Sequence, residues 1–279
     1  MSKPRVVVTR TADQAPVFCQ KLAAAGFTPI AFPAIQLEPL PTALLEAALQ
    51  KIHTFDWLVF TSGNAVDFFF KQSTINNQQS TINNFPKIAA TGSATAQKLN
   101  VLGITVNFIP DKFVGEELVA GLGNLTNQNV LLPRAKRGRP EIVKLLREAG
   151  AEVTEVALYD TITAVPTPTA LAQLAQGFKA ITFTSPSSVR NFLKIIDSRP
   201  DRFQKPVRSL LQTTVITCIG PITATAARDL GLTVTLMPTQ YTIDSMVQEL
   251  KTHFPTVGQD AVLTGQNSVL PYEKRNPGD

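Results

Sequence analysis

The chain contains the stretch Phe55-Asp56-Trp57-Leu58-Val59-Phe60-Thr61-Ser62 and, in its second half, the stretch Phe178-Lys179-Ala180-Ile181-Thr182-Phe183-Thr184-Ser185. In each stretch a short apolar run typical of a buried strand ends in a Thr-Ser pair. Serine and threonine are the residues expected to cap a helix that follows. The two stretches have the same length and order, so the chain contains one strand-to-helix unit twice.

Other short sequence motifs, before and after these Thr-Ser pairs, also occur twice and in the same order. They are Thr9-Arg10, Gly26, Gly92 before Thr95, and Pro110 in the first copy, and Pro133-Arg134, Gly150, Gly220 before Thr223, and Pro238 in the second. Most of these motifs separate an apolar run rich in Val and Ile from a helical pattern, and such alternation is typical of a parallel α/β fold. Gly26 and Gly150 are predicted to end helices, because glycine tolerates the left-handed backbone needed there.

Each copy is predicted to finish with a strand and a helix. The strands end at Pro110 and Pro238, and the amphipathic helices carry Leu118 and Leu122 or Met246 and Leu250. Two segments depart from the repeat. Residues 72–77 recur almost at once as 79–84, which predicts a surface loop without a functional role, and residues 266–279 are predicted to be a frayed tail.

Length and charge limit the class of protein. The chain has 279 residues, enough for about two domains, and a net charge of +5, which favours anionic partners. It has neither a signal-peptide pattern nor an apolar run of about 18 residues that could span a bilayer, so we expect a soluble cytoplasmic protein. No basic stripe with interleaved aromatic residues is present, so we expect no nucleic-acid partner.

The motifs that are missing exclude several kinds of chemistry. The chain lacks G-x-G-x-x-G, G-x-x-x-x-G-K-[ST], H-E-x-x-H and G-x-S-x-G. His53 and His253 fall at unmatched positions of the two copies, which indicates surface or helix-end histidines rather than metal ligands. Cys19 and Cys218 lie in apolar contexts, which predicts buried thiols without a catalytic role.

The strand-to-helix turns remain as the candidate functional site. In a parallel sheet they lie at the carboxyl edge, where free N–H groups stand at the positive ends of helix dipoles. A single turn of this kind is commonly only a helix cap, but recurrence in both copies favours a two-sided cleft for carboxylates or phosphates. The predicted ligand-binding residues are Thr9, Arg10, Thr61, Ser62, Gly63, Gly92, Ser93, Thr95, Arg134, Thr184, Ser185, Pro186, Ser187, Ser188, Gly220, Pro221, Thr223, Tyr241 and Thr242.

The densest basic stretch begins at one of these turns. It comprises Arg134, Lys136, Arg137 and Arg139, and Lys144 and Arg147 follow at helical spacing. Two interpretations stay open for it, a solvated loop and helix face or a site for an acidic small molecule.

The order of the motifs resembles that of the uroporphyrinogen-III synthase family. The most specific parts are Ile181–Ser188, Ile219–Ala224 and Ala157-Leu158-Tyr159-Asp160-Thr161, and the resemblance covers about Val6 to Leu250. It implies an α/β fold of two flavodoxin-like domains with parallel sheets, joined by a two-stranded β linker. Domain 1 would comprise residues 1–35 and 165–265, domain 2 residues 40–155, and the linker residues 35–40 and 156–164.

The resemblance also implies a reaction. It is the cyclisation of hydroxymethylbilane to uroporphyrinogen III, with inversion of ring D and loss of water, by a lyase without cofactor. Apart from the resemblance, we expect a monomer, and the missing motifs predict no metal site. The linear tetrapyrrole substrate carries eight carboxylates, which suits an edge of N–H and hydroxyl donors. Tyr159 matches the tyrosine of the linker motif and is implied as a proton donor of modest effect; the alternative is a tyrosine that only packs on a domain face.

Two further functions stay open on the residues alone. A two-lobed binding or sensor protein would close on an acidic small molecule without chemistry. A nucleotide-dependent enzyme is disfavoured, because the phosphate-binding fingerprints are missing.

Overall fold

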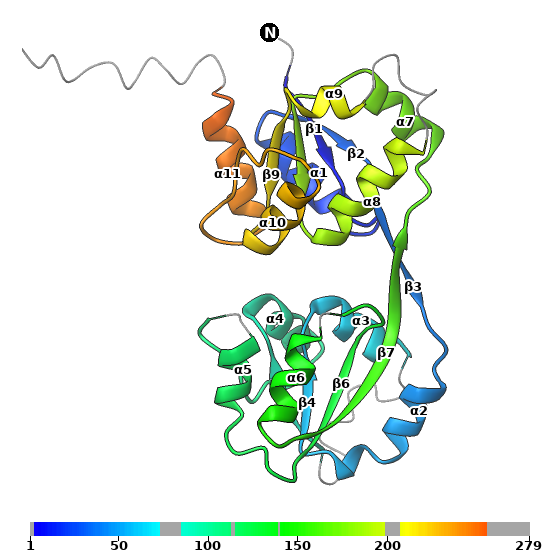
Figure 1. Ribbon diagram of the computed structural model, residues 1–279, viewed down its shortest axis with the longest axis vertical. Coiled ribbons are helices and arrows are strands. Elements are labelled where there is room, and N and C mark those ends of the chain that lie inside the picture. Colours follow the sequence, from blue (N-terminus) through cyan, green and yellow to red (C-terminus); the bar gives the residue numbers. More distant parts are fainter. Residues whose placement is uncertain (1–2, 73–84, 113–114, 139, 199–206, 256–279) are drawn as a thin grey trace, which may run out of the picture. The chain divides into compact units, whose positions relative to one another are not determined.

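A computed structural model describes residues 3–72, 85–112, 115–138, 140–198 and 207–255. The predicted surface loop, Arg139 and the predicted tail 266–279 lie outside the described residues, apart from Gln72 at the start of the loop. The chain divides into two compact units (Figure 1). Unit 1 comprises Met1–Ile35 and Thr163–Asp279, and unit 2 comprises Gln36–Ile162.

The sheet of unit 1 is parallel. Its strands, in spatial order, are β2 (Thr28–Ala31), β1 (Arg5–Val8), β8 (Ala180–Phe183) and β9 (Val215–Cys218). All four residues of β8 are buried, as its apolar sequence predicts. The predicted strand that ends at Pro238 is wrong as a full strand, because only a single bridge joins Leu236 to Thr217. An extended segment therefore continues the sheet beyond β9.

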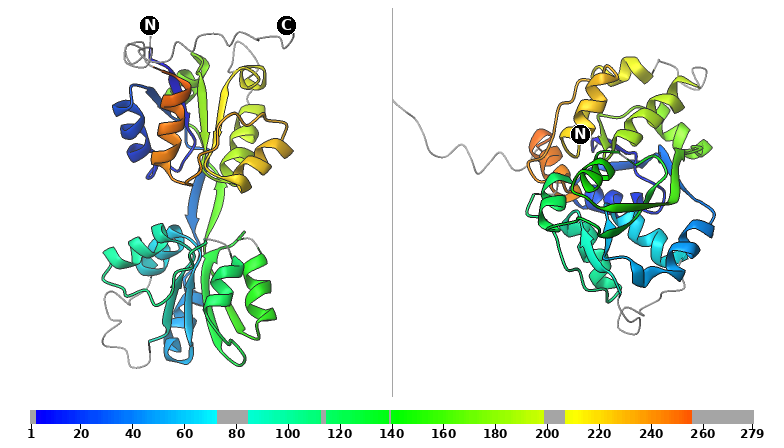
Figure 2. Two further views of the ribbon diagram at one scale, coloured as in Figure 1. Left: turned by 90° about the vertical axis from the view of Figure 1, so that its left-hand side faces the viewer. Right: turned by 60° about the horizontal axis from the view of Figure 1, so that its bottom comes forward.

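Helices cover both faces of this sheet (Figure 2). One face carries α1 (Ala15–Ala24) and α11 (Ile243–His253), and the other carries α7 (Pro168–Ala175), α8 (Pro186–Asp197), α9 (Val207–Leu211) and α10 (Pro221–Asp229). Phe183 and Phe192 show why, since both are fully buried and their rings meet edge to face at 5.8 Å. Apolar side chains on both faces of the strands thus hold one helix layer each.

The sheet of unit 2 repeats this arrangement. Its strands, in spatial order, are β3 (Ile35–Pro39), β7 (Glu152–Thr163), β6 (Asn129–Ala135), β4 (Trp57–Phe60) and β5 (Lys87–Ala90). The pairs β7–β6, β6–β4 and β4–β5 are parallel. The predicted strand that ends at Pro110 is again one bridge, from Phe108 to Ala89.

Helices also cover both faces of the second sheet. One face carries α2 (Ala43–Gln50), the 3-10 helix η1 (Ile52–Thr54), α3 (Gly63–Gln72) and α4 (Ser93–Val101), and the other carries α5 (Gly115–Gly121) and α6 (Glu141–Glu148). The predicted amphipathic helix with Leu118 is α5, and Leu122 lies just beyond its end. No helix within the described ranges is long and apolar enough to cross a bilayer.

Strands β3 and β7 carry the chain between the units and pair with each other. The Leu40 N–H donates to the Leu158 carbonyl at 3.0 Å, and the Ala164 N–H donates to the Ala34 carbonyl at 3.2 Å. Residue numbers fall along one strand as they rise along the other, so the pair is antiparallel. The first strand-helix unit of the chain therefore lies in unit 1 with the later elements of the second copy.

The ends of the helices follow the local sequence. Gly26 and Gly150 have φ angles of 93° and 91° directly after α1 and α6, which confirms the two predicted helix ends. Ser185 and Ser188 form a reciprocal capping box at the start of α8, with Ser188 N–H to Ser185 Oγ at 3.1 Å and Ser185 N–H to Ser188 Oγ at 3.3 Å. The Thr-Ser pair thus ends a buried strand and begins a helix within one turn.

Candidate active site

The carboxyl edge of the unit 1 sheet collects the predicted residues of both sequence copies. Strand register places Val8 beside Thr182, and Phe183 beside Cys218. The turns that begin at Thr9, Thr184 and Gly220 therefore leave the sheet at the same edge. Residues far apart in the sequence meet there because the strands are parallel.

Some of the side-chain hydroxyls at this edge already donate hydrogen bonds within the protein. Thr9 Oγ1 donates to the Thr182 carbonyl and Ser188 Oγ donates to the Ser185 carbonyl, each at 2.7 Å. Thr223 is also buried. Ser185 Oγ accepts from Ser188 N–H and keeps its own proton for another acceptor. A ligand at this edge would therefore meet backbone N–H groups, the Ser185 hydroxyl and the partly exposed side chains of Thr184 and Ser187.

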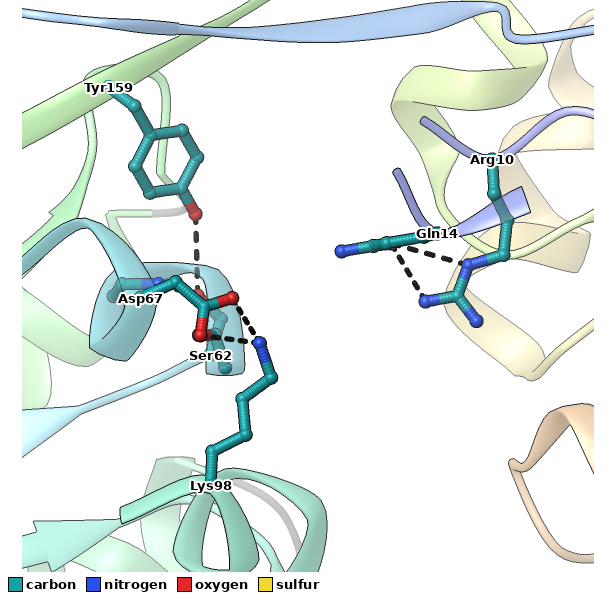
Figure 3. Close-up of polar contacts among 8 residues, drawn as sticks. Arg10, Gln14, Ser62, Asp67, Lys98 and Tyr159 are labelled. Carbon is teal, nitrogen blue, oxygen red and sulfur yellow. Dashed lines mark hydrogen bonds and ion pairs between the residues drawn. The ribbon is translucent and has the colours of Figure 1, made fainter. Parts of the chain in front are cut away.

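Arg10 brings a positive charge to the unit 1 edge. Its Nη2 and Nε donate to Gln14 Oε1 at 2.8 and 3.3 Å (Figure 3). Burial lowers the pKa of the guanidinium and nearby Asp13 raises it, and arginine still titrates far above neutral pH. Gln14 thus orients a charged, partly buried guanidinium.

Thr11 is a further residue at this edge that the sequence does not single out. It is buried, and among the described residues its Oγ1 has no hydrogen-bond partner. A buried hydroxyl without a partner costs about 1–3 kcal/mol. Thr11 is therefore a candidate donor to a ligand that binds beside Arg10.

Tyr241 joins the same edge through a contact with Gly220. A Cβ at Gly220 would lie 3.2 Å from two Tyr241 ring carbons, and Tyr241 is 58 % exposed. The φ angle of Gly220 is −172°, so space rather than backbone conformation favours glycine here. Thr242 Oγ1 accepts from Ser245 N–H at 3.1 Å and caps α11. An exposed aromatic ring therefore lies between the beginnings of two helices.

The carboxyl edge of the unit 2 sheet has the corresponding turns. Register places Phe60 beside Ala90, and Leu58 beside Leu131, so the turns after β4 and β5 leave the sheet near Arg134 at the end of β6. Ser93 is exposed at this edge, whereas Thr95 is buried in the first turn of α4.

Tyr159 lies beside the Ser62 turn although 97 residues separate them in the sequence. Its hydroxyl oxygen is 3.3 Å from Ser62 Oγ, and Ser62 Oγ accepts from Ala65 N–H at 3.2 Å (Figure 3). The ring stacks on Phe68 with centroids 4.7 Å apart, and the residue is only 4 % exposed. The ring thus packs as the alternative interpretation expects, while the hydroxyl reaches a predicted binding turn.

The surroundings of Tyr159 keep its phenol protonated. Burial has the largest effect and raises the pKa of Tyr159, hydrogen bonds to Ser62 and Asn64 lower it, Asp67 raises it and Arg134 lowers it. The net shift is upward from the ordinary value. At neutral pH the side chain therefore has a proton to give.

Lys98 links α3 and α4, the helices that follow β4 and β5. Its Nζ forms an ion pair with Asp67 on α3 (Figure 3). The same Nζ donates to the Gly63 carbonyl at 3.4 Å. A Cβ at Gly63 would lie 2.8 Å from Lys98 Cδ, so glycine leaves room for the lysine stem. The sequence gives no signal for this pair, because the two residues lie 31 positions apart on different helices of the first copy.

Arg134 is buried at the end of β6 and shares an acidic partner with Arg147. Arg134 Nη1 lies 3.2 Å from Glu155 Oε2, and Arg147 Nη2 lies 3.3 Å from Glu155 Oε1. A groove of about 550 Å³ is lined here by Arg134, Lys136, Gly138, Pro140, Val143, Lys144, Arg147, Glu148 and Glu155. The basic stretch therefore faces an open groove, but Glu155 balances part of its charge.

The histidines and cysteines take no part in these edges. His53 and His253 are exposed at η1 and at the end of α11, as predicted. Cys19 and Cys218 are free thiols. Cys218 is buried as predicted, but Cys19 is only partly buried because α1 leaves one side of it accessible. Across the described ranges, no three His, Cys, Asp or Glu side chains are grouped to hold a metal ion.

The Cys218 thiol is expected to resist alkylation in the folded protein. Burial raises its pKa to about 12, and Arg228 lowers it only in part, so almost no thiolate forms at neutral pH. Treatment with iodoacetamide followed by peptide mass spectrometry checks this. Label should appear at Cys218 only after urea is added, and rapid labelling of the native protein would contradict the burial of the thiol.

The fold defines a class of protein, an α/β protein with parallel sheets whose strand-to-helix turns meet at the carboxyl edges of the sheets. A family model described as uroporphyrinogen-III synthase HemD matches residues 17–248. The chain belongs to the uroporphyrinogen-III synthase family.

Individual relatives agree with the family match. The chain is 31 % identical over 248 residues to a uroporphyrinogen-III synthase of Synechococcus elongatus, covering 87 % of this chain and 92 % of that protein. It is 28 % identical over 252 residues to a putative uroporphyrinogen-III synthase of Methanocaldococcus jannaschii, covering 89 % and 98 %. The crystal structure of uroporphyrinogen-III synthetase from Helicobacter pylori has the same fold, with a TM-score of 0.62, 19 % identity and coverage of 90 % and 99 %.

Proposed function

We propose that this chain cyclises hydroxymethylbilane to uroporphyrinogen III, with inversion of ring D and loss of water. The family match over residues 17–248 carries this conclusion. It makes the chain a cyclising lyase of tetrapyrrole biosynthesis. The two carboxyl edges support it, because a substrate with eight carboxylates needs many N–H donors and few specific side chains.

The binding residues in this proposal are those of the two edges. Backbone N–H groups at the turns that begin with Thr61, Gly92, Thr184 and Gly220 would hold carboxylates of the substrate. Arg10 and Arg134 would add positive charge, and the Ser185 hydroxyl has a proton to donate. Thr9, Thr95, Ser188 and Thr223 are buried, so they would shape the turns rather than contact the substrate.

The chemical step in this proposal is mainly conformational. The electron-rich pyrrole of ring A expels the hydroxyl, which takes up a proton and leaves as water, and the electrophilic azafulvene that remains forms with little acid assistance. The protein's larger task is to fold the bilane so that ring A reaches the substituted carbon of ring D and the simpler closure is excluded. Tyr159 would donate a proton to the leaving hydroxyl, and no cofactor or metal would take part.

We extend the proposal to the domains. Domain 1 would comprise residues 1–35 and 165–265 and domain 2 residues 40–155, each flavodoxin-like, with a two-stranded linker of residues 35–40 and 156–164. The order β2-β1-β8-β9 followed by the segment at Leu236 supports this, because it is the 2-1-3-4-5 order of flavodoxin. We propose a cytoplasmic monomer without a nucleic-acid or membrane partner.

The reaction itself gives the test. The protein is incubated with freshly made hydroxymethylbilane, and the type III product is separated from the type I isomer that forms spontaneously. We expect type III in clear excess over a blank that contains heat-unfolded protein. If both samples give the same isomer ratio while the folded protein still binds a tetrapyrrole, the chain is a binding protein and the proposed reaction is wrong.

Replacement of Tyr159 by phenylalanine tests the proton donor. Phenylalanine keeps the stack on Phe68 but removes the hydroxyl. We expect kcat for type III formation to fall about tenfold, less than the roughly 100- to 10,000-fold typical of general acids, because the leaving step is largely self-assisted. Unchanged turnover of a variant with unchanged Tm would dismiss the acid role.

A further inference from the structure

We propose that Ser62 is a positioning residue for Tyr159, whose phenol oxygen accepts a hydrogen bond from the Ser62 hydroxyl when the phenol proton passes to the substrate. The inference rests on the proposed function, because it assumes that Tyr159 donates this proton. It assigns Ser62 a role through Tyr159 rather than through direct contact with a carboxylate.

The helix cap fixes the Ser62 hydroxyl for this role. Ser62 Oγ accepts from Ala65 N–H at 3.2 Å in the first turn of α3, so one of its lone pairs is occupied. Its own proton is still available, and Tyr159 Oη lies 3.3 Å away. Once the phenol proton leaves, Tyr159 Oη can only accept, and Ser62 must then be the donor.

The Tyr159 ring is held in place on several sides. It stacks on Phe68 at an interplanar angle of 20° and belongs to the buried cluster that also contains Phe60 and Phe69. Its backbone is paired with Ala135 in the β6–β7 ladder. A short side chain on a capped turn therefore faces a ring that packing holds still, which is the arrangement that positions a proton donor without reorganisation.

The groups around the phenol act on its ionisation in opposite directions. Hydrogen bonds with Ser62 and Asn64 and the positive charge of Arg134 lower the pKa of Tyr159, whereas burial and the negative charge of Asp67 raise it. Lys98 pairs with Asp67 and so reduces the repulsion between that carboxylate and a phenolate (Figure 3). Hydrogen bonds and one ion pair together offset part of the effect of burial on Tyr159.

A double-mutant cycle tests the proposal through activity. Ser62→Ala should lower kcat about three- to tenfold, because the phenol oxygen carries only part of its charge in the transition state and the loss should not exceed the roughly tenfold effect of Tyr159→Phe. In the Tyr159→Phe background the same change should have no further effect on kcat, and Ser62→Thr should restore activity because it keeps the hydroxyl. Ser62→Ala removes the α3 cap in both backgrounds, so the effect of the lost cap on kcat cancels when the two backgrounds are compared.

The outcomes of the cycle separate the possible roles. An equal loss in both backgrounds would show that Ser62 acts on the substrate directly, and no loss in either would remove it from the mechanism; both overturn the proposal. Ser198→Ala is the matched control. Ser198 Oγ donates to the Ile195 carbonyl at 2.9 Å at the end of α8, so its removal should leave kcat unchanged.

A second measurement does not depend on activity. A fluorinated tyrosine, which ionises nearer neutral pH, is placed at position 159 and followed by 19F NMR as the pH is raised. Ser62→Ala should move the midpoint upward, since the serine donates to the phenolate, and Ser198→Ala should not. Lys98→Met should also move it upward, because Asp67 then loses its ion pair.

The two measurements distinguish failure of this proposal from failure of the proposed function. An unchanged 19F midpoint in Ser62→Ala overturns the proposal even if the wild type makes type III product. Absence of type III product from the wild type contradicts the proposed function, and the proposed role of Ser62 in proton transfer fails with it. A normal kcat in Tyr159→Phe overturns the Ser62 proposal while the reaction stands.

Discussion

Substitution of Phe183 by alanine is expected to destabilise unit 1 by about 3–5 kcal/mol, and Phe60→Ala should destabilise unit 2 by a similar amount. The two phenylalanines occupy the same position in the two sequence copies, and both are fully buried. Phe183 meets Phe192 edge to face, and Phe60 meets Phe69 in the same way with centroids 5.4 Å apart. Each truncation therefore leaves a cavity in the core of one unit.

Two spectroscopic signals distinguish the units in this experiment. Trp57, the single tryptophan of the chain, lies in β4, so its fluorescence reports on unit 2. In urea, Phe60→Ala should shift the fluorescence transition, whereas Phe183→Ala should shift only the part of the far-UV circular dichroism transition that comes from unit 1. Equal shifts of both signals in both variants would show that the whole chain unfolds in one cooperative step.

Gly220→Val is expected to lower kcat/KM about 100-fold, as displacement of site groups by about 1 Å can do. A branched side chain at this position would enter the space of the Tyr241 ring, which a Cβ alone already approaches to 3.2 Å. The ring would move from its place beside α10, and the first turn of that helix would be covered. Because φ at Gly220 is extended, the backbone itself should tolerate valine.

A graded series controls this prediction. Gly220→Ala should have a smaller effect than Gly220→Val, and both variants should keep the Tm of the wild type. In the double variant Gly220→Val with Tyr241→Ala, the valine no longer clashes with the ring. Activity should still stay below that of the wild type if the Tyr241 ring itself contacts the substrate. A normal kcat/KM for Gly220→Val would contradict the placement of this turn in the site.

The sequence predicts those parts of the fold that depend on local signals. The buried strands β4 and β8, the helix ends at Gly26 and Gly150, and the turn that begins at Ser185 all follow from short patterns of apolar, small and capping residues. The segments expected as strands before Pro110 and Pro238 form a single bridge each, although three backbone hydrogen bonds join each segment to β5 or β9. Pairing of this kind depends on tertiary geometry that a short pattern does not contain.

The site is predictable to a smaller extent than the fold. The predicted parallel strands place Thr184 and Gly220 at the same edge of the sheet. The sequence does not show which polar atoms at that edge already form hydrogen bonds within a helix cap. Thr9 and Ser188 bond inward, whereas Ser185 retains a proton. The ion pair of Lys98 with Asp67 and the partner of Arg134 at Glu155 arise between different helices and strands, so no spacing in the sequence indicates them.

The pairing of β1 with β8 has a consequence for the synthesis of the chain. Thr9 bonds to Thr182, 173 positions later, so the ribosome must deliver all of unit 2 before β1 meets this neighbour. Unit 2 is continuous in the sequence and can fold as soon as it emerges. The first strand and helix therefore stay without their sheet partners until unit 2 has been synthesised. Because the contacts of unit 1 join residues far apart in the sequence, we expect unit 1 to fold after unit 2 and more slowly than unit 2.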